Sequence, residues 1–181
     1  MKTFKFKKIN AFTNGSSPGN PAGAVYLDSS EEISVPEMQK IARELKGFVS
    51  EVGYIRQSGE AQFDLKYYSS EREVDFCGHA TVAILYDLLN SREDLRSKDI
   101  VHICNNKGRL AVYNRINSED AVFISAPQPV FSNKAVSIKK LSRALRTDPD
   151  TIDRQLPAAI VNADLETLIV NCIRVCTECP R

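Results

Sequence analysis

Hydrophobic and polar positions alternate with a period of two over much of residues 1–125, a pattern that predicts β-strands. The turn-rich stretch TNGSSPGNPAG (residues 13–23), with three glycines and two prolines, is expected to form a loop. Alternation, together with β-branched and aromatic content, predicts strands at residues 3–12, 24–28, 48–57, 61–69, 99–106, 109–115 and 120–127.

Two segments instead carry apolar residues at the spacing of an α-helix. The first is VPEMQKIARELKG (residues 35–47), whose apolar side chains fall on one face. Pro36 near its first turn and Gly47 at its end are ordinary start and stop signals. This segment is expected to be a surface helix with one buried side.

The second helical segment, ATVAILYDLL (residues 80–89), is apolar nearly all round, because only Thr81 and Asp87 in it are plainly polar. Such a helix is normally enclosed by protein, and this one is far shorter than the roughly 20 residues that cross a bilayer. We therefore expect a central buried helix near residues 78–90 with a barrel-like sheet around it. This order of elements is typical of an α+β fold and not of a doubly wound sheet.

The strand pattern stops at APQPVF (residues 126–131), where two prolines predict a domain junction. Beyond it we expect a helix at 137–146 and a pair of strands within 156–170. The interpretation is a first domain over residues 1–125 and the beginning of a second over 126–181. The second part is too short to bury a core of its own, so we expect a truncated chain.

Charge and cysteine content narrow the class of protein. The chain has 24 basic and 23 acidic residues and a net charge of +1, which gives no electrostatic reason to expect nucleic acid or an anionic membrane as a partner. Five cysteines are an odd number and no secretory signal is visible. Both observations favour reduced thiols in a cytoplasmic protein.

The stretch EVDFCGHATVA (residues 73–83) joins a thiol and one of two histidines to the start of the apolar helix. Two positions apart at a helix start, Cys77 and His79 are expected to point in different directions and not to form a thiolate–imidazole pair. A metal site is not expected, because no third ligand lies nearby at zinc spacing. The helix N-terminus, opened by Gly78, suits a substrate carboxylate or a developing oxyanion. The alternative is a buried structural cysteine.

Glu51 is the second candidate, because it lies amid the apolar residues of 48–55. A carboxylate in such surroundings suits general acid/base work. Alternation alone, however, places Glu51 on the solvent face of a strand. Asn20 lies in GNPAG, which lacks the spacing and the lysine of a phosphate-binding loop, and its side-chain amide is a candidate to line a cleft.

A third pattern is the run Cys172, Cys176 and Cys179 near the C-terminus. Its C-x3-C-x2-C spacing is one that holds iron–sulfur clusters. No cofactor-binding elements follow it, so we expect a mobile tail. The alternatives are an iron–sulfur cluster and an adventitious zinc site at these cysteines.

Three of these segments, INAFTNGSSPGNPAGAVYLD, MQKIARELKGFVSEVGYI and EVDFCGHATVAILYDLL, together resemble the N-terminal half of the PhzF family (phenazine-biosynthesis isomerase-like proteins), which belongs to the diaminopimelate epimerase superfamily. The match is good over roughly residues 5–125. The resemblance implies two similar domains, each a barrel-like sheet around a central helix, with an active site between them.

The resemblance also implies roles for individual residues. Glu51 lies where the family has its catalytic glutamate, and His79 and Gly78 match site residues at the start of the central helix. Asn20 matches a cleft-facing asparagine. Cys77 falls where the epimerases carry a catalytic thiol, and it and Ala80 complete the expected substrate-binding segment.

The implied chemistry is a cofactor-free proton shift on a small carboxylated substrate, with Glu51 as the acid/base, His79 polarising the substrate, and no metal. The aspartate and the Gly-Ser helix start of the family's second domain have no counterpart here, so a homodimer or another chain is expected to complete the site. The alternative is a non-enzymatic remnant that folds by self-association, since its apolar run 156–170 needs a cover.

Overall fold

The computed structural model describes residues 2–162 and 166–173 of the chain, which folds as two compact units, Met1–Ala126 and Pro127–Arg181. None of the described helices is both long and apolar enough to cross a bilayer.

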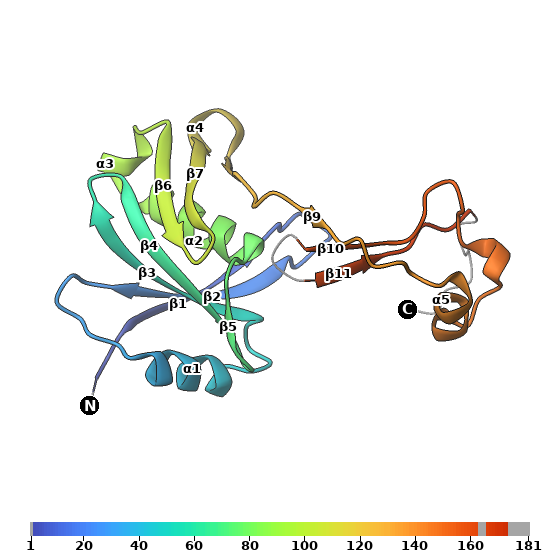
Figure 1. Cartoon of the computed structure of the whole chain (residues 1–181). Helices are drawn as coiled ribbons and strands as arrows, with labels where there is room; N and C mark the ends of the chain where they lie inside the picture. The colour runs from blue at the N-terminus through green and yellow to red at the C-terminus, as the bar shows by residue number, and fades with distance from the viewer. Residues whose placement is uncertain (1, 163–165, 174–181) are drawn as a thin grey trace. The chain divides into compact units, whose positions relative to one another are not determined.

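Unit 1 is a mixed sheet that curls around a helix (Figure 1). The path through the sheet is β1-β2-β3-β4-β6-β7-β8, with the short β5 paired to β4. The β2–β3 and β4–β6 pairs are parallel, and the other pairs are antiparallel. The strands are β1 (Lys5–Ala11), β2 (Asn20–Leu27), β3 (Glu51–Gly59), β4 (Gln62–Ser69), β5 (Glu73–Val74), β6 (Ile100–Asn105), β7 (Gly108–Arg115) and β8 (Ala121–Ile124).

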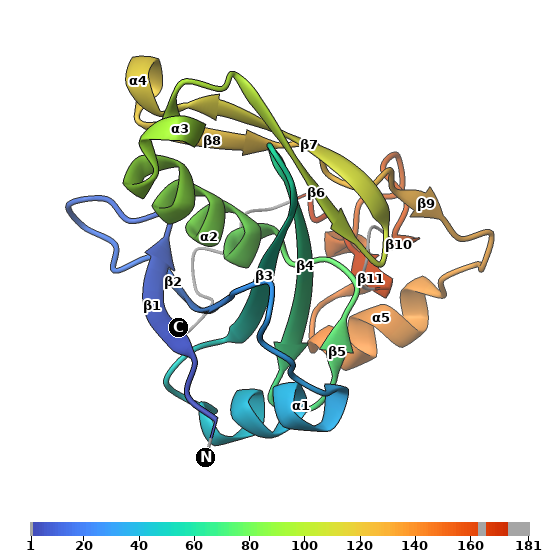
Figure 2. The ribbon, with the colours of Figure 1, turned by 90° about the vertical axis from the view of Figure 1, so that its left-hand side faces the viewer.

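Helix α2 (Gly78–Ser91) lies inside the curl and packs against β1, β2, β3 and β8 (Figures 1 and 2). Its side chains form the main core with residues from nearly every strand. This confirms the α+β fold with a curled sheet around a central buried helix. The buried residues of α2 are Ala80, Thr81, Ala83, Ile84, Leu85, Leu88 and Leu89.

Helix α1 (Val35–Glu44) covers the outer face of the sheet and packs against β3 and β4. A capping box starts it: the Ser34 side chain accepts from the Glu37 N–H, and the Glu37 carboxylate accepts from the Ser34 N–H. Met38 and Ala42 on its apolar side are buried in a second core cluster.

Because α1 and α2 cover opposite faces of β3, the first half of this strand is buried on both sides. Residues 52–55 are all buried in succession. Val52 and Tyr54 belong to the cluster under α1, while Ile55 belongs to the core around α2. The alternation expected over residues 48–57 is therefore wrong, since a strand covered on both faces has no polar face.

The expected loop over residues 13–23 is also too long. Residues Asn20–Leu27 form one continuous strand, β2, which pairs with β1 on one side and with β3 on the other. Pro21 and Gly23 of GNPAG (residues 19–23) are turn signals, but hydrogen bonding on both edges of β2 overrides them.

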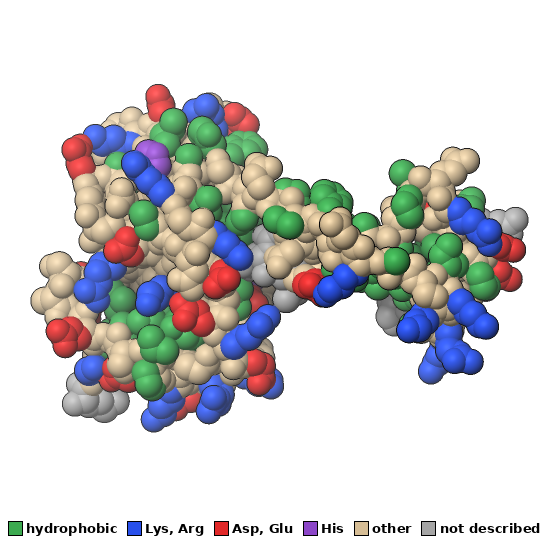
Figure 3. Space-filling model, viewed as in Figure 1, with side chains coloured by type: hydrophobic (Ala, Val, Ile, Leu, Met, Phe, Trp, Pro, Cys, Tyr) green, Lys and Arg blue, Asp and Glu red, His purple; other side chains and the backbone are tan. Residues whose placement is uncertain are grey.

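Two short helices close the C-terminal end of α2: α3 (Glu93–Arg96) and α4 (Ile116–Glu119). The buried Asn114 connects them, because its amide donates to the carbonyls of Arg96 and Lys98 at 3.0 Å each and its Oδ1 accepts from the N–H of Ile116 at 3.1 Å. On the face of unit 1 shown in Figure 3, basic and acidic side chains are interspersed, in line with the balanced net charge.

Unit 2 contains an antiparallel sheet in the order β11-β10-β9, a helix and a 3₁₀ turn. The helix expected at 137–146 and the strand pair within 156–170 are both present. The bounds are β9 (Val130–Phe131), α5 (Ile138–Leu145), η1 (Pro149–Thr151), β10 (Ala159–Asn162) and β11 (Glu166–Ile169). Cys176 and Cys179 lie outside the described residues, so the structure does not address the cysteine pattern.

Candidate active site

Three chemically reactive side chains converge at the start of α2. Glu51 is the first residue of β3, Cys77 is the N-cap of α2, and His79 is in the first turn of the helix. One ligating atom from each of the three lies within 4.8 Å of the other two. All three are at least partly buried, so unit 1 by itself assembles a compact acid–thiol–imidazole cluster.

The topology explains why residues so far apart in sequence meet. Strand β3 is central in the sheet, and the approach of α2 to it is close: a Cβ atom added to Gly53 would overlap the Cδ1 atom of Ile84. The contact between Glu51 and His79 shows that the start of β3 and the start of α2 lie at the same end of the curl. Glycine at position 53 is what allows this approach.

The Cys77 thiol and the His79 imidazole are neighbours, with Sγ 3.3 Å from Nδ1. The expectation that these two side chains point apart is therefore wrong. The reason is the backbone of Cys77, which is extended (φ −137°, ψ 103°) and not helical. Helical spacing rules apply only from Gly78 onward, so they do not govern a pair that includes the N-cap.

Thr81 fixes the first turn of α2. Its hydroxyl donates to the Cys77 carbonyl at 2.7 Å, and its backbone N–H donates to the same carbonyl at 3.0 Å. Because the hydroxyl proton of Thr81 is already donated to the Cys77 carbonyl, the Tyr67 hydroxyl is the donor in the 2.6 Å hydrogen bond between Tyr67 and Thr81 Oγ1. This buried network ties the helix start to β4.

The pair of Glu51 and His79 is largely enclosed, with 24% and 13% of the two side chains exposed. Nε2 of His79 lies 3.3 Å from Oε2 of Glu51, but the pair lacks the alignment of a hydrogen bond. Burial lowers the pKa of His79 below its ordinary value of 6.5, against the opposing effects of the Glu51 carboxylate and the Pro21 carbonyl. The folded protein therefore favours the neutral form of the imidazole.

Asn20 lies beside Glu51 in the sheet. The two residues begin the adjacent parallel strands β2 and β3, with Ala22 opposite Glu51. Asn20 is exposed, and its Oδ1 accepts from the Ser50 hydroxyl at 3.0 Å. The Ser50 N–H in turn donates to the Pro21 carbonyl. Asn20 is thus held at the same end of the strands as the cluster.

Gly78 and Ala80, the remaining predicted site residues, differ in what they can contribute to ligand binding. Gly78 is partly exposed, and a Cβ atom added there would meet only the Phe76 ring at an ordinary 3.8 Å. Ala80 is fully buried in the core, so it has only its backbone N–H to contribute. The first helical hydrogen bond of α2 is made by Thr81, which leaves the N–H groups of residues 78–80 without an intrahelical acceptor.

Tyr67, Thr81 and Ser50 support the cluster, although the sequence does not predict this role for them. Thr81 carries the one available signal, because it is a polar residue in an apolar helix and a buried hydroxyl needs a hydrogen-bond partner. Nothing in the sequence distinguishes Tyr67 from its neighbour Tyr68 as the residue that supplies this partner.

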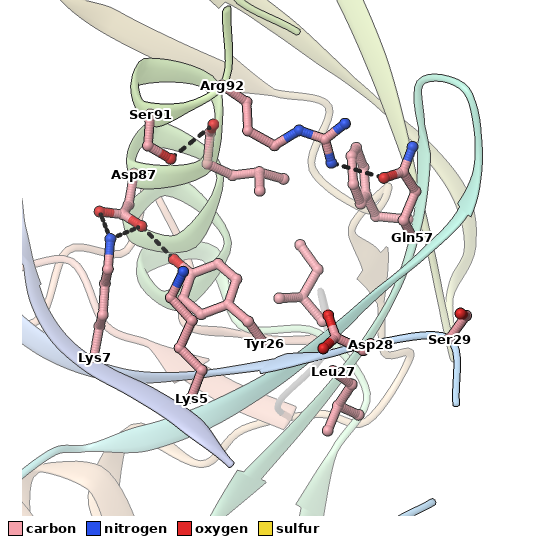
Figure 4. Close-up of a pocket in the computed structure, with 13 residues that line it drawn as sticks. Lys5, Lys7, Tyr26, Leu27, Asp28, Ser29, Gln57, Asp87, Ser91 and Arg92 are labelled. Atoms are coloured by element: carbon pink, nitrogen blue, oxygen red, sulfur yellow. Dashed lines mark hydrogen bonds and ion pairs between the residues drawn. The ribbon is translucent and has the colours of Figure 1, made fainter. Parts of the chain in front are cut away.

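A pocket lies near the opposite, C-terminal end of α2 (Figure 4). Its volume is about 450 Å³. Its wall contains Asp87, whose carboxylate accepts from Lys7 Nζ at 2.7 Å and from the Tyr26 hydroxyl at 2.5 Å. The pKa of the Tyr26 phenol is raised mainly by burial and, to a smaller extent, by the hydrogen bond to Asp87. These polar groups satisfy one another, so we interpret this cluster as structural.

The solved structures that resemble the chain define the class of fold. A PhzF-family phenazine biosynthesis protein from Bacillus anthracis superposes with a TM-score of 0.74 and 31% identity, covering 94% of this chain and 56% of that protein. A predicted epimerase from Pseudomonas aeruginosa shares the fold, with a TM-score of 0.71 at 17% identity, over 94% of this chain and 60% of that one. The fold is thus that of the PhzF and epimerase-like proteins.

The sequence comparisons give the family. The model of the PhzC-PhzF family, phenazine biosynthesis-like protein, matches residues 9–176, and the chain belongs to this family. It is 34% identical over 173 residues to the uncharacterized isomerase YfhB of Bacillus subtilis, covering 94% of this chain and 57% of that protein. An uncharacterized isomerase of Deinococcus radiodurans is 28% identical over 165 residues, covering 89% of this chain and 52% of that protein. The chain spans little more than half the length of these relatives.

Proposed function

We propose that the chain provides the acid/base half of an isomerase that moves a proton on a small carboxylated substrate without a cofactor. The observation that carries the proposal is the convergence of the Glu51 carboxylate and the His79 imidazole, 3.3 Å apart and largely enclosed, at a helix N-terminus. Membership of a family whose relatives are described as isomerases supports the same reaction class.

Glu51 is the proposed acid/base. As a carboxylate it takes a proton from a substrate carbon, and as the resulting acid it returns a proton at another carbon of the same molecule. The proton count is unchanged and no oxidant or reductant is needed, so the net reaction is an isomerisation.

His79 is the proposed polarising group. A neutral imidazole donates a hydrogen bond without bringing a full charge beside Glu51, and its lowered pKa keeps it in that form. It would bind the substrate atom on which negative charge develops as the proton leaves. Cys77, 3.3 Å from His79 Nδ1, would hold the ring in place.

The substrate carboxylate would bind at the start of α2. The N–H groups of Gly78, His79 and Ala80 lack intrahelical acceptors there, and the positive end of the helix dipole favours an anion. The side chain of Asn20, which is held by Ser50 at the start of β2, would supply a further polar contact.

We propose that the chain acts as a homodimer and that it is located in the cytoplasm. Exposed apolar side chains on the described part of unit 2 support association, since a second copy would cover them. They are Val130, Phe131, Leu145, Leu156, Leu168, Ile169 and Ile173.

The test is proton–deuterium exchange in D₂O into a dihydro-hydroxyanthranilate-type compound and a panel of other small carboxylates, followed by NMR. The wild type should incorporate deuterium at carbon, and Glu51→Gln should lose this exchange while remaining folded. Equal exchange by the two proteins would contradict the role given to Glu51.

The competing function is that of a non-enzymatic protein that folds by self-association. The exposed apolar residues of unit 2 favour it as strongly as they favour an active dimer. Sedimentation and exchange together separate the two. An oligomer without exchange on any substrate fits the non-enzymatic protein, an oligomer with Glu51-dependent exchange fits the isomerase, and a well-behaved monomer contradicts the self-association.

A further inference from the structure

We propose that Glu51, Cys77 and His79 form a zinc site, and that zinc bound there inhibits proton transfer. The inhibitory part rests on the proposed function, because the ion would occupy the same carboxylate and imidazole. The binding part does not, since it needs only the three ligands. Among the described residues 2–162 and 166–173, Glu51, Cys77 and His79 are the group whose ligating atoms lie close enough together to share one ion.

The chemistry of the donor set favours zinc. A thiolate, an imidazole and a carboxylate are the three protein ligands that zinc binds most often, and a set of three leaves the fourth tetrahedral position to water. Magnesium and calcium take oxygen ligands and have little affinity for a thiolate. On binding, the Cys77 thiol loses its proton to the solvent, while His79 binds as the neutral imidazole and Glu51 as the carboxylate.

The geometry is close to what a tetrahedral ion requires. Zinc bonds of about 2.0–2.3 Å imply ligand-to-ligand separations of roughly 3.3–3.7 Å. Here Sγ lies 3.3 Å from Nδ1, Oε2 lies 3.3 Å from Nε2, and one ligating atom from each residue falls within 4.8 Å of the others.

The thiol and the carboxylate flank different nitrogens of the His79 ring. Whichever nitrogen binds the ion, one of the other two groups must move by on the order of 1 Å, judged from the same zinc bond lengths. Glu51 is the group that would move, because its side chain has rotatable torsions and is 24% exposed.

The sequence alone argues against a metal here, because Cys77 and His79 have no third ligand nearby in the chain. The fold supplies it, by placing the first residue of β3 beside the first turn of α2. The extended N-cap backbone that turns Cys77 toward His79 is the second contribution of the fold.

Zinc binding is tested on the full chain, stripped of metal and titrated with Zn²⁺ against a zinc-binding chromophore. We expect one ion per chain. Cobalt(II) in place of zinc should give the near-ultraviolet charge-transfer band of a thiolate ligand. Cys77→Ser should abolish that band. Cys77→Ser and Glu51→Gln should each weaken zinc binding by at least 10–100-fold, the loss typical when a residue that only supports a metal ligand is replaced.

Two controls locate the ion. Cys104→Ser removes a thiol that lies outside the cluster and should leave binding unchanged. A variant with Cys172, Cys176 and Cys179 all replaced by serine removes the C-terminal cysteines and should also retain one zinc. Binding that survives Cys77→Ser but is lost with the C-terminal cysteines would overturn the proposal, as would the absence of stoichiometric zinc in the wild type.

The inhibitory part has its own readout. If the chain catalyses exchange, one equivalent of Zn²⁺ should suppress it and a chelator should restore it, whereas exchange that continues with zinc bound would overturn inhibition. A chain that binds zinc but never exchanges protons would contradict the proposed isomerase and leave the zinc site standing, so the two failures are distinguishable.

Discussion

Gly53 of β3 and Ile84 of α2 are packed so closely that a methyl group on Gly53 would overlap the Cδ1 atom of Ile84. This contact sets the distance between the strand that begins at Glu51 and the helix whose first turn carries His79.

Gly53→Ala is therefore expected to destabilise unit 1 by about 1–3 kcal/mol, the usual cost of overpacking a core. Urea unfolding followed by circular dichroism measures it. Ile84→Val removes the overlapping atom, so the double variant should lose less stability than the sum of the single variants. Gly15→Ala, with no atom within 4 Å of the added carbon, is the matched control. A Gly53→Ala protein as stable as the wild type would contradict this packing.

Thr81→Val tests the network at the start of α2. The change keeps the shape of the side chain and removes its bonds to the Cys77 carbonyl and the Tyr67 hydroxyl. The expected cost is about 1–3 kcal/mol, because buried polar groups lose partners. Thr13→Val, at an exposed threonine, should have little effect. If the two variants unfold at the same denaturant concentration, the network does not stabilise the helix start.

Asp87→Asn tests the structural interpretation of the pocket in Figure 4. Losing the ion pair to Lys7 should cost on the order of 1 kcal/mol, because 38% of the lysine side chain is exposed. The pKa of Tyr26 should fall but stay above its ordinary value, since burial is the larger cause of the shift. NMR of labelled tyrosine during an alkaline titration measures this. Asp28→Asn, in the same pocket, is the control; an unchanged Tyr26 pKa in Asp87→Asn would contradict the assignment.

The sequence was sufficient for the elements whose environment is uniform. The all-round apolar character of residues 80–89 predicts a buried central helix, and α2 is one. The amphipathic pattern of 35–47 predicts a surface helix, and α1 covers one face of the sheet. In both cases the local pattern directly reflects how much of the helix surface is covered.

The predictions made from the sequence are wrong where contacts between distant parts of the chain determine the local structure. Alternation predicts a solvent-facing Glu51, but β3 is covered on both faces, so its pattern is not a surface pattern. Turn residues predict a loop through Gly23, but two neighbouring strands draw Asn20–Leu27 into the sheet. Helical spacing separates Cys77 from His79, but the N-cap is not helical. None of these tertiary effects is visible in a local window of sequence.

Protonation of His79 should couple the site to pH. Because burial lowers the pKa of His79 in the folded protein, the folded state disfavours the imidazolium. This residue's contribution to stability is therefore fully present above the unfolded pKa of about 6.5 and declines as the pH falls below it. His79→Gln should weaken the loss of stability on acidification in this range, measured by urea unfolding at a series of pH values. An identical pH profile in the variant would contradict this assignment.

The most direct test of the Glu51–His79 pair is an NMR titration of the two histidines in metal-free protein, with His102→Gln used to assign the signals. The wild-type His79 midpoint should lie below 6.5, and Glu51→Gln should lower it further, because the carboxylate favours the protonated ring. A midpoint at or above 6.5, or one that does not move in Glu51→Gln, would contradict the account that unit 1 couples the two groups in one site.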